Sequence, residues 1–150
     1  MKSNFSIGML FMLSFTLMSS MCSSDDMKDP IDIMAIENTA KSGTWFISSF
    51  MDSGQNETGH FNGFSFSFEN SGTLTATNGS DILLGTWSIT NNNDDSDGAE
   101  LNIMFSTPTL SEFEDLNDDW DITTYDNNTI RLEDVSGGNG GTDILVFTKN

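Results

Sequence analysis

The sequence predicts an all-β domain: eight short antiparallel strands in a meander that closes into a barrel or folds into a sandwich, with one short helix. Three observations support this prediction. From Gly43 onward, apolar and polar residues alternate with a period of two, which is typical of strands with one buried face. Turn-forming stretches such as Asn70-Ser71-Gly72 separate the alternating runs. The chain has 150 residues, which suits one domain with one core.

The alternation is clearest at residues 64–68, where three phenylalanines share one face and polar side chains share the other. Comparable runs recur along the chain, each bounded by glycine, asparagine, aspartate or serine. The eight expected strands span residues 44–50, 64–68, 73–77, 86–90, 101–105, 120–125, 129–135 and 143–148.

One helical segment interrupts the strands. Ser111 and Glu114 have the spacing of a capping box, and Leu110, Phe113 and Leu116 recur at three-residue intervals. This pattern predicts about two helical turns, which we expect to plug one end of the barrel.

The amino terminus resembles a bacterial lipoprotein signal. Lys2 and an apolar run over residues 7–18 precede Cys22, the only cysteine of the chain. The run has the length of a signal-peptide core and is shorter than the roughly 20 residues of a membrane-spanning helix. The resemblance implies that residues 1–21 are removed and that Cys22 carries acyl groups such as palmitate, which hold the chain in a membrane. The alternative is an ordinary secretory signal with a free cysteine, because Met21 is bulky for the position before cleavage.

Residues 22–42 are expected to form an acidic tether, in which Asp29-Pro30 begins a short helix through Ile33 and Ile36. The stretch Ser23-Ser24-Asp25-Asp26 resembles the export signals that follow the lipidated cysteine of Bacteroidetes surface lipoproteins. This resemblance implies an exported protein, lipid-anchored at the outer membrane and exposed at the cell surface. The remaining residues, 43–150, form the expected barrel domain.

The chain is strongly acidic, with a formal net charge of −18. Removal of residues 1–21 takes away Lys2 and no acid, which leaves 23 acidic residues against four basic ones. Such a surface repels nucleic-acid phosphates and anionic lipid headgroups, so nucleic acid is excluded as a partner. It attracts cations, basic proteins or calcium, although acidity also serves solubility alone. We expect a monomer that contacts the membrane only through its lipid.

Short motifs within residues 43–150 suggest a family. Gly43-Thr44-Trp45 is similar to the Gly-x-Trp unit that opens the first strand of the lipocalin-like lipoproteins of Bacteroidetes. Gly85-Thr86-Trp87, Asp118-Asp119-Trp120 and the glycine-rich residues 137–141 resemble small uncharacterised flavobacterial lipoproteins. The resemblance implies a lipocalin-like barrel in a cell-surface setting. It implies no catalytic residue, because that group has no common reaction.

A barrel of this kind either encloses an apolar pocket or packs solid, and bulky aromatic residues in a short chain favour the filled core. If the barrel is hollow, inward-facing residues of the strands form the pocket wall. These candidates are Phe64, Phe66, Phe68, Leu101, Ile103, Phe105, Leu145 and Phe147.

Calcium is the one cofactor that the sequence suggests. Asn93, Asp95 and Asp97 precede a glycine at alternate positions, as in the first half of an EF-hand loop, and Glu100 could add a ligand. The second half of that loop fails, because Met104 stands where the bidentate glutamate belongs. The alternative is a polar hairpin loop whose side chains bind their own backbone. A second acidic group has the same two interpretations: Asp115, Asp118, Asp119 and Asp121.

Catalytic patterns are weak, and we expect no enzyme and no catalytic residue. His60 is the only histidine, which excludes a zinc site made of several histidines and gives a catalytic triad no identifiable partners. The glycine-rich residues 137–141 lead into a strand rather than a helix, so they predict a turn rather than a phosphate loop. The function expected is that of an acylated surface lipoprotein whose noncatalytic barrel binds a small apolar ligand or serves an envelope role. The alternative is a calcium-stabilised interaction or glycan-adhesion module.

Overall fold

The computed structural model describes residues 31–92, 98–106, 110–135 and 141–150. They form a closed antiparallel barrel of eight strands, which follow one another in chain order until the last strand pairs with the first. The strands are β1 (Thr44–Asp52), β3 (Ser65–Phe68), β4 (Thr73–Thr77), β5 (Ile82–Asn91), β6 (Ala99–Met104), β7 (Asp118–Tyr125), β8 (Thr129–Val135) and β9 (Thr142–Lys149). All eight expected strands are confirmed, as a barrel rather than a sandwich. An unexpected two-residue strand, β2 (Gln55–Asn56), pairs with the end of β1.

The barrel closes where β1 pairs with β9, from Trp45↔Lys149 to Met51↔Ile144. The backbone N–H of Asn150 extends this seam by donating to the carbonyl of Thr44 at 3.0 Å. On its other side β1 pairs with β3 at only two positions. The strands then diverge, and a 3₁₀ helix, η1 (Thr58–Phe61), packs against β1.

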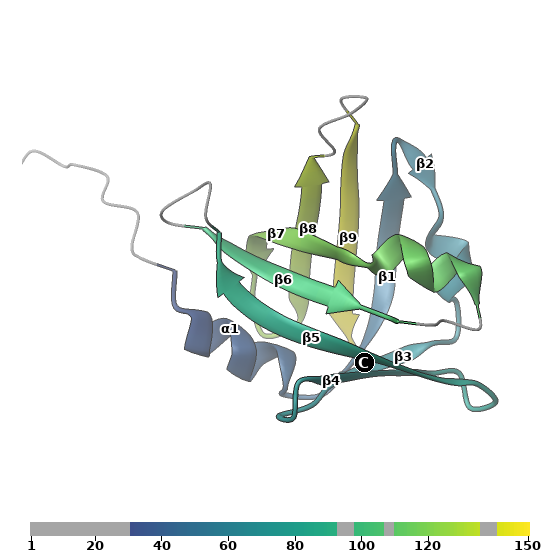
Figure 1. The fold of residues 1–150 in the computed structure, drawn as a ribbon, viewed down its shortest axis with the longest axis horizontal. Helices are drawn as coiled ribbons and strands as arrows, with labels where there is room; N and C mark the ends of the chain where they lie inside the picture. The colour runs from purple at the N-terminus through teal and green to yellow at the C-terminus, as the bar shows by residue number, and fades with distance from the viewer. Residues whose placement is uncertain (1–30, 93–97, 107–109, 136–140) are drawn as a thin grey trace, which may run out of the picture.

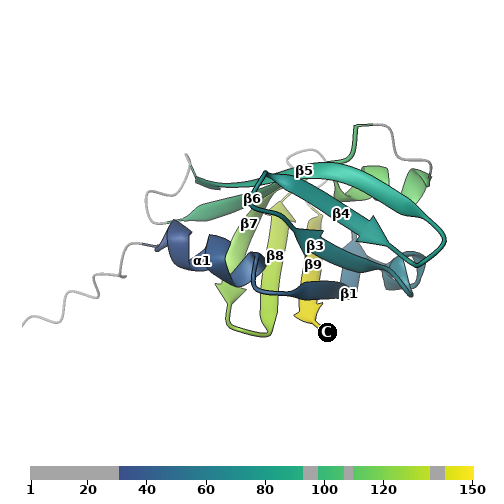
Figure 2. The same cartoon turned by 90° about the horizontal axis from the view of Figure 1, so that it is seen from below.

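The barrel is flattened into two crossing layers. Strands β5 and β6 pass over β8 and β9 at a steep angle (Figure 1). The view from below shows the two pairs of strands in separate layers (Figure 2). Inward-facing residues of both layers form a single core of buried hydrophobic side chains. No helix in the described part of the chain is long and apolar enough to span a bilayer.

The helix α1 (Ile33–Ala40) lies against one end of the barrel (Figure 2). Its N-cap is Asp32, whose Oδ1 accepts from the N–H of Ala35 at 3.1 Å, rather than the expected Asp29-Pro30. Ile36 and Ala40 are fully buried in the barrel core. The packed part of the chain therefore begins before Gly43, within the residues expected to be tether.

The expected helical plug is present as a 3₁₀ helix, η2 (Ser111–Leu116). Its N-cap is Leu110, and no side chain caps it, so the capping box expected of Ser111 does not form. Phe113 is fully buried and points into the barrel. The indole nitrogen of Trp120 donates to the carbonyl of Leu116 at 3.0 Å, which ties the end of η2 to β7.

Candidate functional site

The eight residues expected to wall a pocket all lie in the barrel core, with exposed fractions between 0 and 5%. The phenylalanine rings among them contact one another and the ring of Phe113 directly. The ring centroids of Phe66 and Phe147 are 5.4 Å apart, and those of Phe68 and Phe147 are 5.5 Å apart. Phe113 of η2 lies 5.1 Å from Phe105 and 5.0 Å from Phe64. These edge-to-face distances are typical of close packing, so the rings of this face pack on one another.

A hollow lined by described residues lies on the outer face of the barrel. It has a volume of about 530 Å³ and crosses β5, β6 and the start of β7. We call it the outer groove. Its lining residues are Thr86, Trp87, Ser88, Asn102, Ile103, Met104, Asn117, Asp118 and Asp119.

Strand register explains the shape of the outer groove. Trp87 pairs with Ile103, which pairs in turn with Asp118, so these residues form one row across three strands. The first two side chains are buried in the core, and the row therefore presents its backbone outward. This backbone forms the floor. The outward side chains of the two adjacent rows form the walls: Ser88, Asn102 and Asp119 on one side, Thr86 and Met104 on the other.

The end of the groove is held by Asn117, which joins β6 to the start of β7. Its Oδ1 accepts from the N–H of Phe105 at 2.5 Å, and its Nδ2 donates to the carbonyl of Phe105 at 3.1 Å. A side chain that satisfies both backbone groups of one residue mimics a strand pair. The position of the following residues, Asp118 and Asp119, is fixed as a result.

Asp118 is the most perturbed acid in the groove. Its pKa is raised to about 6, mainly because the carboxyl group is partly buried. The side chain of Asp119 and the charge of Asp134 raise the pKa further, while the backbone N–H of Asp119, 2.8 Å from Oδ1, acts in the opposite direction. The described residues that line the groove include no basic side chain. The groove therefore offers negative charge that nothing in its lining neutralises.

Exposed apolar side chains adjoin the groove on β5 and β6. Met104 of the wall is 51% exposed. Leu84 and Ile82 are 66% and 70% exposed, and they continue the outward row of Thr86 along β5 because residues two apart share a face. The groove is thus acidic at its β7 end, and an exposed apolar surface made by Met104, Leu84 and Ile82 adjoins it beyond Thr86.

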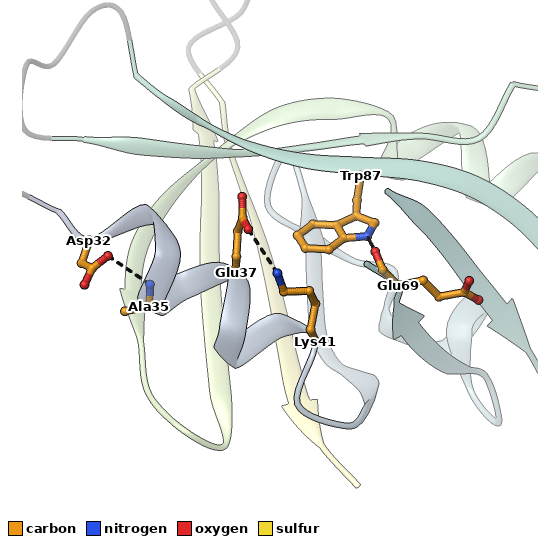
Figure 3. A network of polar contacts seen from close by, with 6 residues as sticks. All are labelled: Asp32, Ala35, Glu37, Lys41, Glu69 and Trp87. Atoms are coloured by element: carbon orange, nitrogen blue, oxygen red, sulfur yellow. Dashed lines mark hydrogen bonds and ion pairs between the residues drawn. The ribbon is translucent and has the colours of Figure 1, made fainter. Parts of the chain in front are cut away.

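A second hollow, of about 150 Å³, lies between α1 and β5. Figure 3 shows its main polar contacts: Lys41 is paired with Glu37 at 3.2 Å, and the Trp87 indole N–H donates to the carbonyl of Glu69 at 3.0 Å. Its lysine is already paired within the helix, and its tryptophan is nearly buried. Helix α1 therefore covers this part of β5, which has no strand partner on the β4 side beyond Thr86.

The described residues do not test the calcium hypothesis. Asn93, Asp95 and Asp97 lie outside them, as does Cys22. Glu100 lies in β6 opposite Asp121. Within the described ranges, no group of three or more histidine, cysteine, aspartate or glutamate side chains has the arrangement of a metal site.

The second acidic group does not converge on one point. Asp115 lies on η2, where partial burial and the charge of Asp52 raise the pKa of its carboxyl group while His60 lowers it. Asp118 and Asp119 line the outer groove, whereas Asp121 lies beyond it and accepts from Nδ2 of Asn92 at 2.5 Å. His60 is half-exposed on η1, and its Nδ1 lies 3.3 Å from Glu57.

Sequence reasoning did not identify the outer groove. Ile103, Asp118 and Asp119 of its lining were candidates for an inner pocket or a metal site. The outward wall residues, such as Ser88 and Asn102, were not. The available signal was the run of exposed apolar residues at Ile82 and Leu84 on an otherwise polar face. Predicting the groove would also have required the register between β5, β6 and β7, which cannot be read from the sequence alone.

Comparison with known proteins gives one structural likeness. The sequence matches no protein-family model and no curated protein. The fold is similar to the crystal structure of a DUF4847 family protein from Bacteroides vulgatus, with a TM-score of 0.49 and 21% sequence identity, over 77% of this chain and 97% of that chain.

Proposed function

We propose that this chain is an exported lipoprotein, acylated at Cys22 and anchored in the outer membrane, whose barrel faces outward and binds a surface partner without catalysis. The observation that supports the binding role is that the open hollow lies on the outside of the barrel and not within it. The aromatic core packs ring against ring, while the outer groove of about 530 Å³ is open to solvent and partly apolar. Its volume lies within the range of roughly 300–1,000 Å³ that ligand sites have.

A membrane anchor at the amino terminus fits this arrangement. The described part of the chain begins just before α1, which lies against one end of the barrel (Figure 2). The outer groove lies on the side of the barrel, on strands β5 to β7, and so does not depend on the anchor for its shape. We expect the lipid to determine where the protein is located and the surface of the barrel to determine which partner it binds.

Cys22→Ala tests the anchor. The wild-type protein should incorporate labelled palmitate and sediment with outer membranes, whereas the variant should do neither and should be released in soluble form. Protease added to intact cells should degrade the wild-type barrel if it faces outward. Continued membrane retention of the unlabelled variant would contradict the lipid anchor.

Native mass spectrometry of purified residues 23–150, which lack the acylation site at Cys22, tests with and without chelator where binding occurs. A bare, monomeric polypeptide in both samples is the result expected of a filled barrel. An added mass of a few hundred daltons that survives chelation would instead indicate a small apolar ligand within the barrel. Loss of calcium masses on chelation would favour the calcium-stabilised adhesion module.

A further inference from the structure

We propose that the outer groove docks an extended, basic and apolar segment of a partner protein, which places its cationic side chains against Asp119 and its apolar side chains against Met104 and Leu84. This inference rests on the proposed function, since it names the partner class of the same groove.

Charge complementarity indicates a cationic occupant. Asp118 and Asp119 lie together at the β7 end of the groove. The next outward row continues the acidic surface, because Glu100 pairs with Asp121 and Asp121 pairs with Glu133. Within this row Glu133 is paired with Arg131, whose guanidinium lies 2.8 Å away. A segment carrying lysine or arginine would meet opposite charge at Asp119, whereas an anionic glycan or nucleic acid would be repelled.

The apolar side of the groove argues for a peptide rather than a simple cation. Met104, Leu84 and Ile82 expose more than half of each side chain, on strands whose other outward residues are polar. An inorganic cation or a polyamine would leave this surface uncovered. A segment in which basic and apolar residues both occur would cover it, and its apolar contacts would add the burial that exposed ion pairs alone do not supply.

The wall groups suit an extended backbone. Ser88, Thr86 and Asn102 present hydroxyl and amide groups beside a floor of backbone. Asn102 also donates from Nδ2 to Oγ1 of Thr90 at 3.0 Å, which holds its amide in the wall. Groups of this kind can donate to and accept from a peptide backbone whatever its side chains. Specificity would then come from the acidic end and the apolar side.

Fluorescence anisotropy with labelled decapeptides tests the docking on the purified protein. The probes are an alternating lysine–leucine peptide, a lysine–serine peptide and a glutamate–leucine peptide. At low ionic strength we expect the lysine–leucine peptide to bind most tightly, the lysine–serine peptide about tenfold more weakly, and the glutamate–leucine peptide not at all. Binding should also weaken about threefold or more between pH 7 and pH 5, as the carboxyl group of Asp118, beside Asp119, loses its charge.

Matched variants locate the contact. Asp119→Asn should weaken lysine–leucine binding about threefold to tenfold, while Glu57→Gln, which removes one charge beside η1, should change it less than twofold. Leu84→Ser should weaken the lysine–leucine peptide and leave the lysine–serine peptide unchanged. Equal losses for Asp119→Asn and Glu57→Gln would show that the peptide is attracted by the overall negative charge of the protein, which would overturn docking in the groove. The docking would also be overturned if none of the three peptides bound. Tight binding of the glutamate–leucine peptide that Leu84→Ser abolishes would overturn the basic segment and leave the groove as the proposed binding site.

Discussion

The ring of Phe113 stacks on the ring of Phe66, with centroids 6.0 Å apart and ring planes inclined by 25°. Phe66 belongs to β3 and Phe113 to η2, so this contact joins the barrel wall to the segment that closes its end. The same Phe113 ring meets Phe61 edge-on at 5.4 Å. Aromatic packing therefore holds the middle of the plug, and the hydrogen bond from the Trp120 indole to the carbonyl of Leu116 holds its end.

Phe113→Ala is expected to destabilise the protein severely. The side chain is fully buried, and its removal leaves a cavity among rings that cannot easily collapse. Truncations of this kind cost about 3–5 kcal/mol. Urea unfolding measures the loss. Phe46→Ala is the control, because Phe46 is 37% exposed on β1, and its truncation should cost about 1 kcal/mol or less. Similar losses in both variants would show that Phe113 has no special role in closing the barrel.

Gly85→Ala is expected to strain the contact between β5 and the end of β6. A Cβ atom at Gly85 would lie 2.7 Å from the carbonyl oxygen of Met104 and 2.9 Å from the ring of Phe105. Backbone cannot yield as a flexible side chain does, and overpacking of this kind costs about 1–3 kcal/mol. Gly59→Ala is the matched control, since nothing lies within 4 Å of its Cβ position. A thermal scan in which both variants melt together would contradict the close approach.

Phe66→Asp and Ser67→Asp test the register of β3. Phe66 is fully buried and faces the core, whereas Ser67 is partly exposed on the opposite face. A carboxylate at position 66 would be buried without a cation, so the first variant should fail to fold or unfold at low urea concentration. The second should remain within about 1 kcal/mol of the wild-type stability. Equal tolerance of the two substitutions would place the wrong face of the strand in the core.

The strands were predictable from sequence because period-two alternation reports burial directly. The run at Phe66 and its neighbours is unambiguous, and the structure places all of its aromatic rings in the core. Strand β2 was not predictable, since Gln55 and Asn56 carry no apolar alternation and pair with β1 only through a turn. Helix α1 was expected, but its burial was not: Trp45 donates its indole N–H to the carbonyl of Ala40 at 2.8 Å, a tertiary contact that no local pattern contains.

The candidate site divides in the same way. The sequence identified the inward residues and favoured a filled core, which agrees with the ring contacts. It also flagged Asp118 and Asp119, as candidates for a metal. Their place beside Asn102 depends on how far β6 is shifted along β7, and this register is set by tertiary contacts such as the two hydrogen bonds of Asn117. The outer groove therefore appears only in the folded chain.

Asp118→Asn is expected to stabilise the protein at neutral pH. The folded-state pKa of Asp118 is about 6, above the usual 3.8, so the folded protein binds this proton more tightly than the unfolded chain does. The stability of the wild-type protein therefore falls as the pH rises from about 4 to about 6, because the unfolded carboxyl group ionises first. Asparagine cannot ionise, and its Oδ1 can still accept from the N–H of Asp119.

The two proteins should differ little at pH 3.5, where the wild-type carboxyl group is largely protonated in both states. Above pH 6.5 the variant should be more stable, by about 1 kcal/mol once screening of this partly exposed group is taken into account. Urea unfolding at several pH values measures the difference. A constant difference across this range would show that Asp118 does not have a raised pKa in the folded protein, and the expected weakening of peptide binding below pH 6 would lose its physical basis.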